Sequence, residues 1–100
     1  MYNQIFVLKK ALESKGVPFE FAESCELGGY GLVYPSRNQF VCSVIEHDYS
    51  YGHEQDLLEI MGLTDDEPYD DVVGYLTAED VFQRIYRHYK TTFKEGCNHD

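Results

Sequence analysis

The stretch QFVCSVIE, residues 39–46, decides which fold this chain can adopt, because it is apolar on both sides of an extended strand. Successive side chains of a strand point to opposite faces of the sheet. A strand with two apolar faces is typical of the centre of a sheet that is covered on both sides. The two sets are Phe40, Cys42 and Val44 on one face and Val41 and Ile45 on the other.

The residues before this strand predict a helix and two further strands. An apolar pattern with helical spacing, ended by Gly16, predicts a helix over residues 3–14. Residues 19–23 (FEFAE) alternate apolar and polar side chains, as a half-buried strand does. Residues 25–31 read as a glycine-bearing turn, and LVYP at 32–35 reads as a strand that forms a hairpin with the central one.

The residues after the central strand predict a short helix over 54–61 (EQDLLEIM). Leu57, Leu58 and Met61 would share one face of that helix, and Gly62 would end it. The opposite face would carry the acidic side chains Glu54, Asp56 and Glu59.

A strand over 72–76 (VVGYL) and a long final helix complete the prediction. Thr77 and Asp80 have the spacing of a capping box, which marks the start of this helix. Its apolar side recurs at helical spacing through Phe82, Ile85, Tyr86, Tyr89 and Phe93.

The resulting order, α-β-β-β-α-β-α, predicts an α+β fold with a mainly antiparallel sheet packed by helices. We expect one domain over residues 1–94 and a frayed tail over 95–100.

The negative charge is concentrated in the middle of the chain. The formal net charge is −10, and residues 23–80 hold fourteen carboxylates against one base, Arg37. Contacts to phosphates need lysine and arginine, so this distribution argues against direct binding to nucleic acid. A strong field of one sign is explained by solubility or by a partner of opposite charge.

Composition also indicates where the protein works. No apolar run approaches the ~18–20 residues of a membrane span, and the first residues lack the pattern of a signal peptide. The three cysteines are odd in number and have no CxxC spacing, which is typical of free thiols in a reducing compartment. We therefore predict a cytoplasmic protein without a membrane segment.

Catalytic and metal-binding patterns are weak. Residues 47–56 combine His47 and His53 with several carboxylates, but their spacing matches no zinc signature, and we predict no cofactor. Cys25, in a turn, and Cys97, beside His99 in the tail, are the more accessible thiols, and Cys25 is the candidate for a nucleophile because the tail offers no fixed geometry. A non-enzymatic protein is the preferred interpretation, and a small metal- or thiol-dependent enzyme that uses His47, His53 and Cys25 stays an alternative.

The run TDDEPYDD, residues 64–71, suggests a surface for a basic partner. Carboxylates accept the forked hydrogen bonds of arginine, and tyrosine rings accept its stacked guanidinium group. The partner-binding residues that we predict are Asp65, Asp66, Glu67, Tyr69, Asp70 and Asp71 from this run, Glu54, Asp56 and Glu59 from the acidic face of the 54–61 helix, and Tyr49 and Tyr51 from the loop before it.

The stretches FVCSVIEHDYSYGHEQDLLEIMGL (40–63) and VVGYLTAEDVFQRI (72–85) resemble a recurrent type of small uncharacterised protein from mobile elements of Gram-positive bacteria. Small acidic proteins of that origin include anti-CRISPR inhibitors, several of which imitate DNA in the basic channel of an RNA-guided nuclease. The resemblance is one of type, not of motif. It brings no assigned activity and assigns no residue, and the expectation of an inhibitor of this kind comes from the size, acidity and origin that it implies.

These observations lead to two functional hypotheses besides the enzyme. The first is a nucleic-acid mimic that inhibits a basic nucleic-acid-binding enzyme, such as an RNA-guided nuclease. The second is a homo-oligomeric accessory protein that works through its apolar faces. The sequence leaves the oligomeric state open.

Overall fold

The computed structural model describes residues 2–24, 26–62 and 72–94. Its main elements are one helix, five strands and a second helix. In chain order the elements are α1 (Gln4–Ser14), β1 (Glu20–Ser24), β2 (Gly29–Pro35), β3 (Phe40–Glu46), the short 3-10 helix η1 (His53–Gln55), β4 (Leu58–Met61), β5 (Val72–Leu76), α2 (Ala78–Tyr89) and the π-helical turn η2 (Lys90–Lys94). The predicted α+β class is confirmed.

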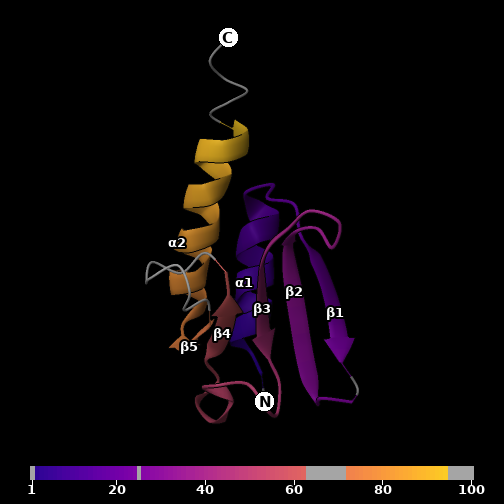
Figure 1. The fold of residues 1–100 in the computed structure, drawn as a ribbon. Coiled ribbons are helices and arrows are strands. Elements are labelled where there is room, and N and C mark those ends of the chain that lie inside the picture. Colours follow the sequence, from indigo (N-terminus) through magenta and orange to yellow (C-terminus); the bar gives the residue numbers. More distant parts are fainter. Residues whose placement is uncertain (1, 25, 63–71, 95–100) are drawn as a thin grey trace.

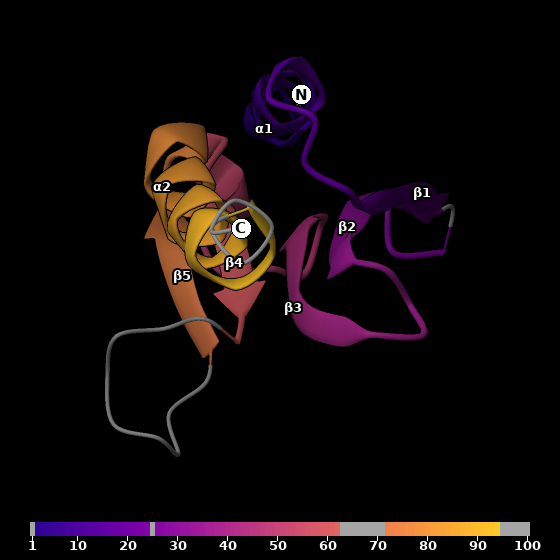
Figure 2. The same cartoon turned by 90° about the horizontal axis from the view of Figure 1, so that it is seen from above.

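The five strands form one antiparallel meander in the order β1-β2-β3-β4-β5, so each strand pairs with its neighbour in the chain. Both helices lie on the same side of this sheet (Figures 1 and 2). α1 contacts β2 and β3, whereas α2 contacts β4 and β5 and packs beside α1. Neither helix in the part of the chain that the structure describes is long and apolar enough to cross a membrane.

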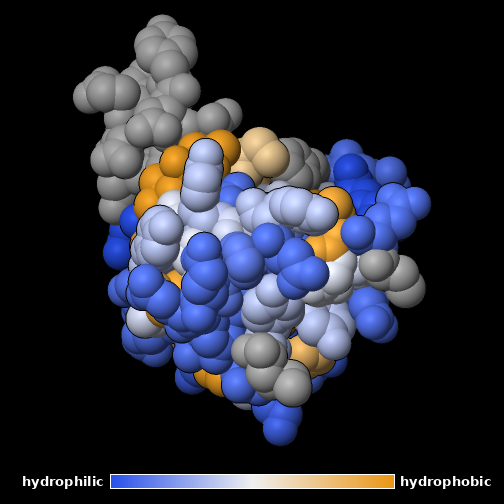
Figure 3. All heavy atoms as spheres, turned by 90° about the horizontal axis from the view of Figure 1, so that it is seen from below, coloured by the Kyte–Doolittle hydropathy of each residue, from blue (hydrophilic) through white to orange (hydrophobic). Residues whose placement is uncertain are grey.

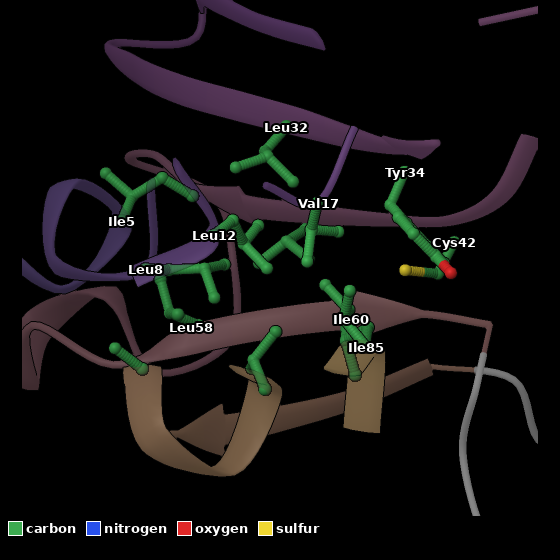
Figure 4. Packing of buried hydrophobic residues seen from close by; sticks show 13 residues of the cluster. Ile5, Leu8, Leu12, Val17, Leu32, Tyr34, Cys42, Leu58, Ile60 and Ile85 are labelled. Atoms are coloured by element: carbon green, nitrogen blue, oxygen red, sulfur yellow. The ribbon is translucent and has the colours of Figure 1, made fainter. Parts of the chain in front are cut away.

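The core lies between the two helices and the sheet (Figure 4). Each helix contributes one apolar stripe, and the strands contribute alternate residues, as the periodicities of the two structures require. The buried apolar residues are Ile5, Leu8, Leu12, Val17, Leu32, Tyr34, Cys42, Val44, Leu58, Ile60, Ala78, Val81 and Ile85.

The predicted helix over residues 54–61 is wrong. A single 3-10 turn, His53–Gln55, is ended by Asp56 in the left-handed conformation, and β4 follows directly. Leu58 and Ile60 alternate with exposed or half-exposed neighbours and are both fully buried under the helices. Over so short a run the residues fit the period of a helix as well as that of a strand. Pairing of β4 with β3 on one side and with β5 on the other decides for the strand.

The prediction that residues 39–46 are covered on both faces is also wrong. Cys42 and Val44 are fully buried, but Val41, Ser43 and Ile45 on the other face are only half-buried. Both helices cover the same face of the sheet, so the opposite face keeps contact with solvent.

Strand β2 starts earlier than predicted, within the expected turn 25–31. Gly29 begins it, and a Cβ atom at this position would come 2.2 Å from the carbonyl oxygen of Glu46 on β3. Glycine is therefore needed for the close approach of the two strands. The predicted turn is present at residues 26–28, and its last three predicted residues, 29–31, belong to β2. The tail 95–100 lies outside the described residues.

Candidate functional site

One end of the molecule collects exposed carboxylates. At this lower end in Figure 1 the β1–β2 turn, the loop after β3, η1 and the starts of both helices come together. Hydrogen bonds join these segments, from Asp48 N–H to the Leu27 carbonyl and from Ala78 N–H to the side chain of Gln4. Seen from below, the surface is mostly hydrophilic (Figure 3). We call this surface the acidic end and define it by its exposed members, Glu23, Glu26, Asp48, Glu54, Glu79 and Asp80.

The positively charged residues lie elsewhere in the chain. The lysines and arginines are in the middle of the helices, at or after their C-terminal ends or, for Arg37, in the β2–β3 turn at the other end of the sheet. In the described part of the chain, Lys9 pairs with Glu13 at 3.1 Å and Arg37 pairs with Glu20 at 3.5 Å. Neither pair includes a carboxylate of the acidic end, so the charge of that surface is not neutralised by them.

Two carboxyl groups from distant parts of the chain cap the start of α1. Asp56 Oδ1 accepts the backbone N–H groups of Asn3 at 2.7 Å and Gln4 at 3.2 Å. Glu46 Oε1 accepts the N–H of Ile5 at 3.1 Å. The first N–H groups of a helix have no partner within it, and they attract negative charge. The predicted partner-binding residue Asp56 therefore has a structural role, and it turns toward the helix.

Glu46 is the most unusual of these groups. Its side chain is fully buried, and its second oxygen, Oε2, has no partner within hydrogen-bond distance among the described residues. Burial raises the pKa of Glu46 to about 8, and the nearby Asp56 contributes in the same direction. Although burial acts to raise the pKa of Asp56 too, the neighbouring Glu46 and the N–H groups of Asn3 and Gln4 lower it overall. Glu46 thus holds the proton of the pair.

Tyr2 connects the segments at this end. Its hydroxyl donates to Asp48 Oδ1 and lies 3.4 Å from His53 Nδ1. The hydrogen bond to Asp48 raises the pKa of Tyr2 to about 12, so the phenol remains a donor at neutral pH. Asp48 in turn lies against Gly28, where a Cβ atom would meet its carboxylate at 2.2 Å.

Exposed tyrosines border the acidic end. Tyr49, Tyr51 and Tyr75 are 75%, 62% and 56% exposed. The backbone N–H of Tyr51 donates to Glu59 Oε1 at 2.8 Å, so the structure brings these two predicted residues together. Tyr75 was missed by the sequence analysis. The available signal was its neighbour Gly74, since a glycine within a strand marks a close approach, and Tyr51 packs over Gly74.

The predicted residues Asp65, Asp66, Glu67, Tyr69, Asp70 and Asp71 lie outside the described residues. The described positions that flank them are Gly62, after β4, and Val72, at the start of β5. Glu54 lies before β4, at the opposite end of that strand. Glu54 and Asp56 therefore precede β4 and Glu59 lies within it, whereas the 64–71 run follows the other end of the strand in the chain.

A recess of about 460 Å³ opens at the acidic end between the start of α1 and the β1–β2 hairpin. Aromatic rings, one carboxylate and two glycines of the turn form it. Its lining residues are Tyr2, Asn3, Phe6, Glu23, Ser24, Gly28, Gly29 and Tyr30.

His47 and His53, the histidines of the enzyme alternative, have different partners. His47 is buried and its Nδ1 accepts the N–H of Tyr49, while His53 contacts Tyr2 and Glu54. Within residues 2–24, 26–62 and 72–94, no three His, Cys, Asp or Glu side chains are placed to hold a metal ion. Burial raises the pKa of Cys42 to about 12, which keeps it a thiol. Cys25 lies outside the described residues.

Comparison with known proteins assigns no relatives: no family model matches the chain, and no curated protein or solved structure is significantly similar to it.

Proposed function

We propose that this protein is a non-enzymatic binding protein whose acidic end docks on a basic protein surface and competes there with nucleic acid. The observation that carries the proposal is the separation of charge along the molecule. Exposed carboxylates gather at one end, beside exposed tyrosines, and the lysines and arginines lie away from it.

This surface has the chemistry that a nucleic-acid-binding site recognises. Duplex DNA presents one negative charge per ~1.7 Å of its axis, together with flat rings. At the acidic end, Glu26, Asp48 and Glu54 supply exposed charge, and Tyr49 and Tyr51 supply exposed rings. Arginines that hold phosphates and stack on bases can bind carboxylates and tyrosines in the same way.

The class of partner follows from this chemistry and from the resemblance described above. A protein that offers the field of a nucleic acid blocks an enzyme whose channel is lined with basic residues. The likeness of type to anti-CRISPR proteins, in size and acidity, leads us to propose an RNA-guided nuclease as that enzyme, since its heteroduplex lies in a positively charged channel.

A competition assay tests the proposal. RNA-guided nucleases from Gram-positive bacteria are incubated with the protein, and binding of labelled target DNA is measured at low and high salt. We expect the wild type to displace DNA and the double variant Glu26→Lys/Glu54→Lys to lose at least tenfold in potency, because two contacts become repulsive. Added salt should weaken the wild type, as it weakens charge-driven association.

The matched control reverses two charges at other places. Glu13→Lys/Glu20→Lys makes the same change in net charge on residues whose exposed ion pairs contribute little to stability. An equal loss of potency in both double variants would mean that net charge alone explains the effect, and it would contradict specific binding through the acidic end. The companion variant Asp66→Lys/Asp70→Lys shows whether the 64–71 run contributes.

The uncovered face of the sheet favours a second candidate function, a homo-oligomeric interaction protein. Met61 and Val72 are exposed neighbours on β4 and β5, and Ile45 lies half-buried on the same face. Faces of this kind pair in dimers. A mass that rises with concentration and falls on Met61→Lys would support this candidate, and a constant monomer mass would exclude it.

A further inference from the structure

We propose that the recess between α1 and the β1–β2 hairpin receives an arginine side chain of the partner protein. The inference rests on the proposed function and gives the acidic end a specific anchoring site. Hot spots of interfaces are commonly an arginine or an aromatic residue held in a pocket, and a volume of about 460 Å³ accommodates a single side chain.

The walls of the recess are aromatic. Phe6 from α1 and Tyr30 from β2 meet edge to face, with ring centroids 4.7 Å apart and planes at 69°. Phe6 is 39% exposed although it is large and apolar, and Tyr2 lines the recess with them. A guanidinium group is planar and weakly hydrated, so it gains more from stacking on such rings than an ammonium group does.

Carboxylates supply the opposite charge. Glu23 lines the recess and is paired in register with Tyr30, which places both side chains on the same face of the β1–β2 ladder. Asp48 lies directly behind Gly28, with one carboxylate oxygen held by Tyr2. The described residues that line the recess include no lysine or arginine. This combination favours a cation and disfavours an anion.

Two glycines of the β1–β2 turn line the recess and allow the turn to pack closely on Asp48 and the end of β3. A Cβ atom at Gly28, which has a φ of +73°, would collide with Asp48, and one at Gly29 would collide with the backbone of Glu46 and His47. Larger residues would therefore displace Asp48 or the end of β3, and with them the turn that lines the recess. Because Gly28 and Gly29 have no side chains, they contribute backbone to that lining.

Titration with small peptides tests the inference directly. Acetyl-Gly-Arg-Gly-amide is added to isotope-labelled protein, and the amide signals of Ser24, Gly28, Gly29 and Tyr30 are followed by NMR. The matched peptides carry citrulline, which is nearly the same shape without the charge, or lysine. We expect the arginine peptide to bind at least tenfold tighter than the citrulline peptide and several-fold tighter than the lysine peptide.

Variants assign the binding to the recess. Glu23→Gln should weaken the arginine peptide about five- to tenfold, as expected for loss of one charged partner. The matched control Glu13→Gln, on α1 outside the recess, should leave binding unchanged. Equal affinity for arginine and citrulline peptides, or signals that shift at other residues, would overturn the proposal.

Failure of the inference is separable from failure of the proposed function. If Glu23→Gln binds the nuclease as the wild type does while Glu26→Lys/Glu54→Lys does not, the acidic end binds without an anchored arginine. If neither variant affects DNA competition but the arginine peptide occupies the recess, the recess is a cation site and the proposed function is wrong.

Discussion

At the scale of single residues, Glu46 should control how stability depends on pH. Its pKa in the folded protein, about 8, lies above the ordinary 4.5, so the folded state holds a proton that the unfolded state releases. The stability that this proton provides is complete below pH 4.5 and is lost as the pH rises through 8. Asp56, whose pKa is lowered, acts in the opposite sense and loses its contribution only in acid.

We therefore expect the free energy of unfolding of the wild type to fall by ~2–4 kcal/mol between pH 5 and 9. This range follows from about 1.4 kcal/mol for each unit by which folding raises the pKa of Glu46. Glu46→Gln keeps an acceptor for the N–H of Ile5 and cannot ionise, so it should be the more stable protein at pH 9. Urea unfolding at a series of pH values measures this. Parallel curves for the two proteins would show that Glu46 does not carry the proton.

The role of Glu46 had a signal in the sequence that was not used. It has the same strand parity as Cys42 and Val44, so the alternation of the strand places its carboxyl group on the buried face. The hydrogen-bond donor to that carboxyl group, the N–H of Ile5, could not be predicted, because Ile5 is 41 residues away in the chain. Tyr51 and Glu54, in contrast, were correctly expected at the surface from local polarity alone.

At the scale of elements, α1 depends on a cap that belongs to another segment. Asn3 precedes the helix but makes no side-chain capping hydrogen bond, and Asp56 takes that role from the end of η1. Asp56→Ala should cost ~1–2 kcal/mol of stability, as loss of a helix cap does. Glu54→Ala, two residues away and exposed, should cost little. Similar losses in both variants, measured by thermal unfolding, would contradict the capping role.

Elements whose pattern is local and long were predictable, and those fixed by tertiary contacts were not. The capping box and apolar stripe of α2 are both present, with Asp80 N–H bonded to Thr77. The run 54–61 is too short for a helical period to be distinguished from that of a strand. Pairing with β3 on one side and β5 on the other decides its structure. The strand and helix order also leaves open which face of the sheet the helices cover.

At the scale of the whole molecule, the separated charges should make the protein sensitive to salt. Like charges at the acidic end repel one another in the folded state, and ions screen that repulsion over about 10 Å at 0.1 M. Both helix N-termini point toward this end, which offsets part of the repulsion. Asp56 and Glu46 are already bonded to the N-terminus of α1, whereas Glu26 and Glu54 are exposed to solvent.

The melting temperature of the wild type should therefore rise by a few degrees when salt is added from 10 to 200 mM, corresponding to ~0.5–1 kcal/mol for a chain of this size. Glu26→Lys/Glu54→Lys should melt higher than the wild type at low salt and respond less to salt, because attraction replaces repulsion. Glu13→Lys/Glu20→Lys makes the same change in net charge but places each new lysine beside a positive residue, Lys9 or Arg37, so it should not gain stability at low salt. Equal gains in the two double variants would mean that net charge alone, and not its collection at one end, governs the stability.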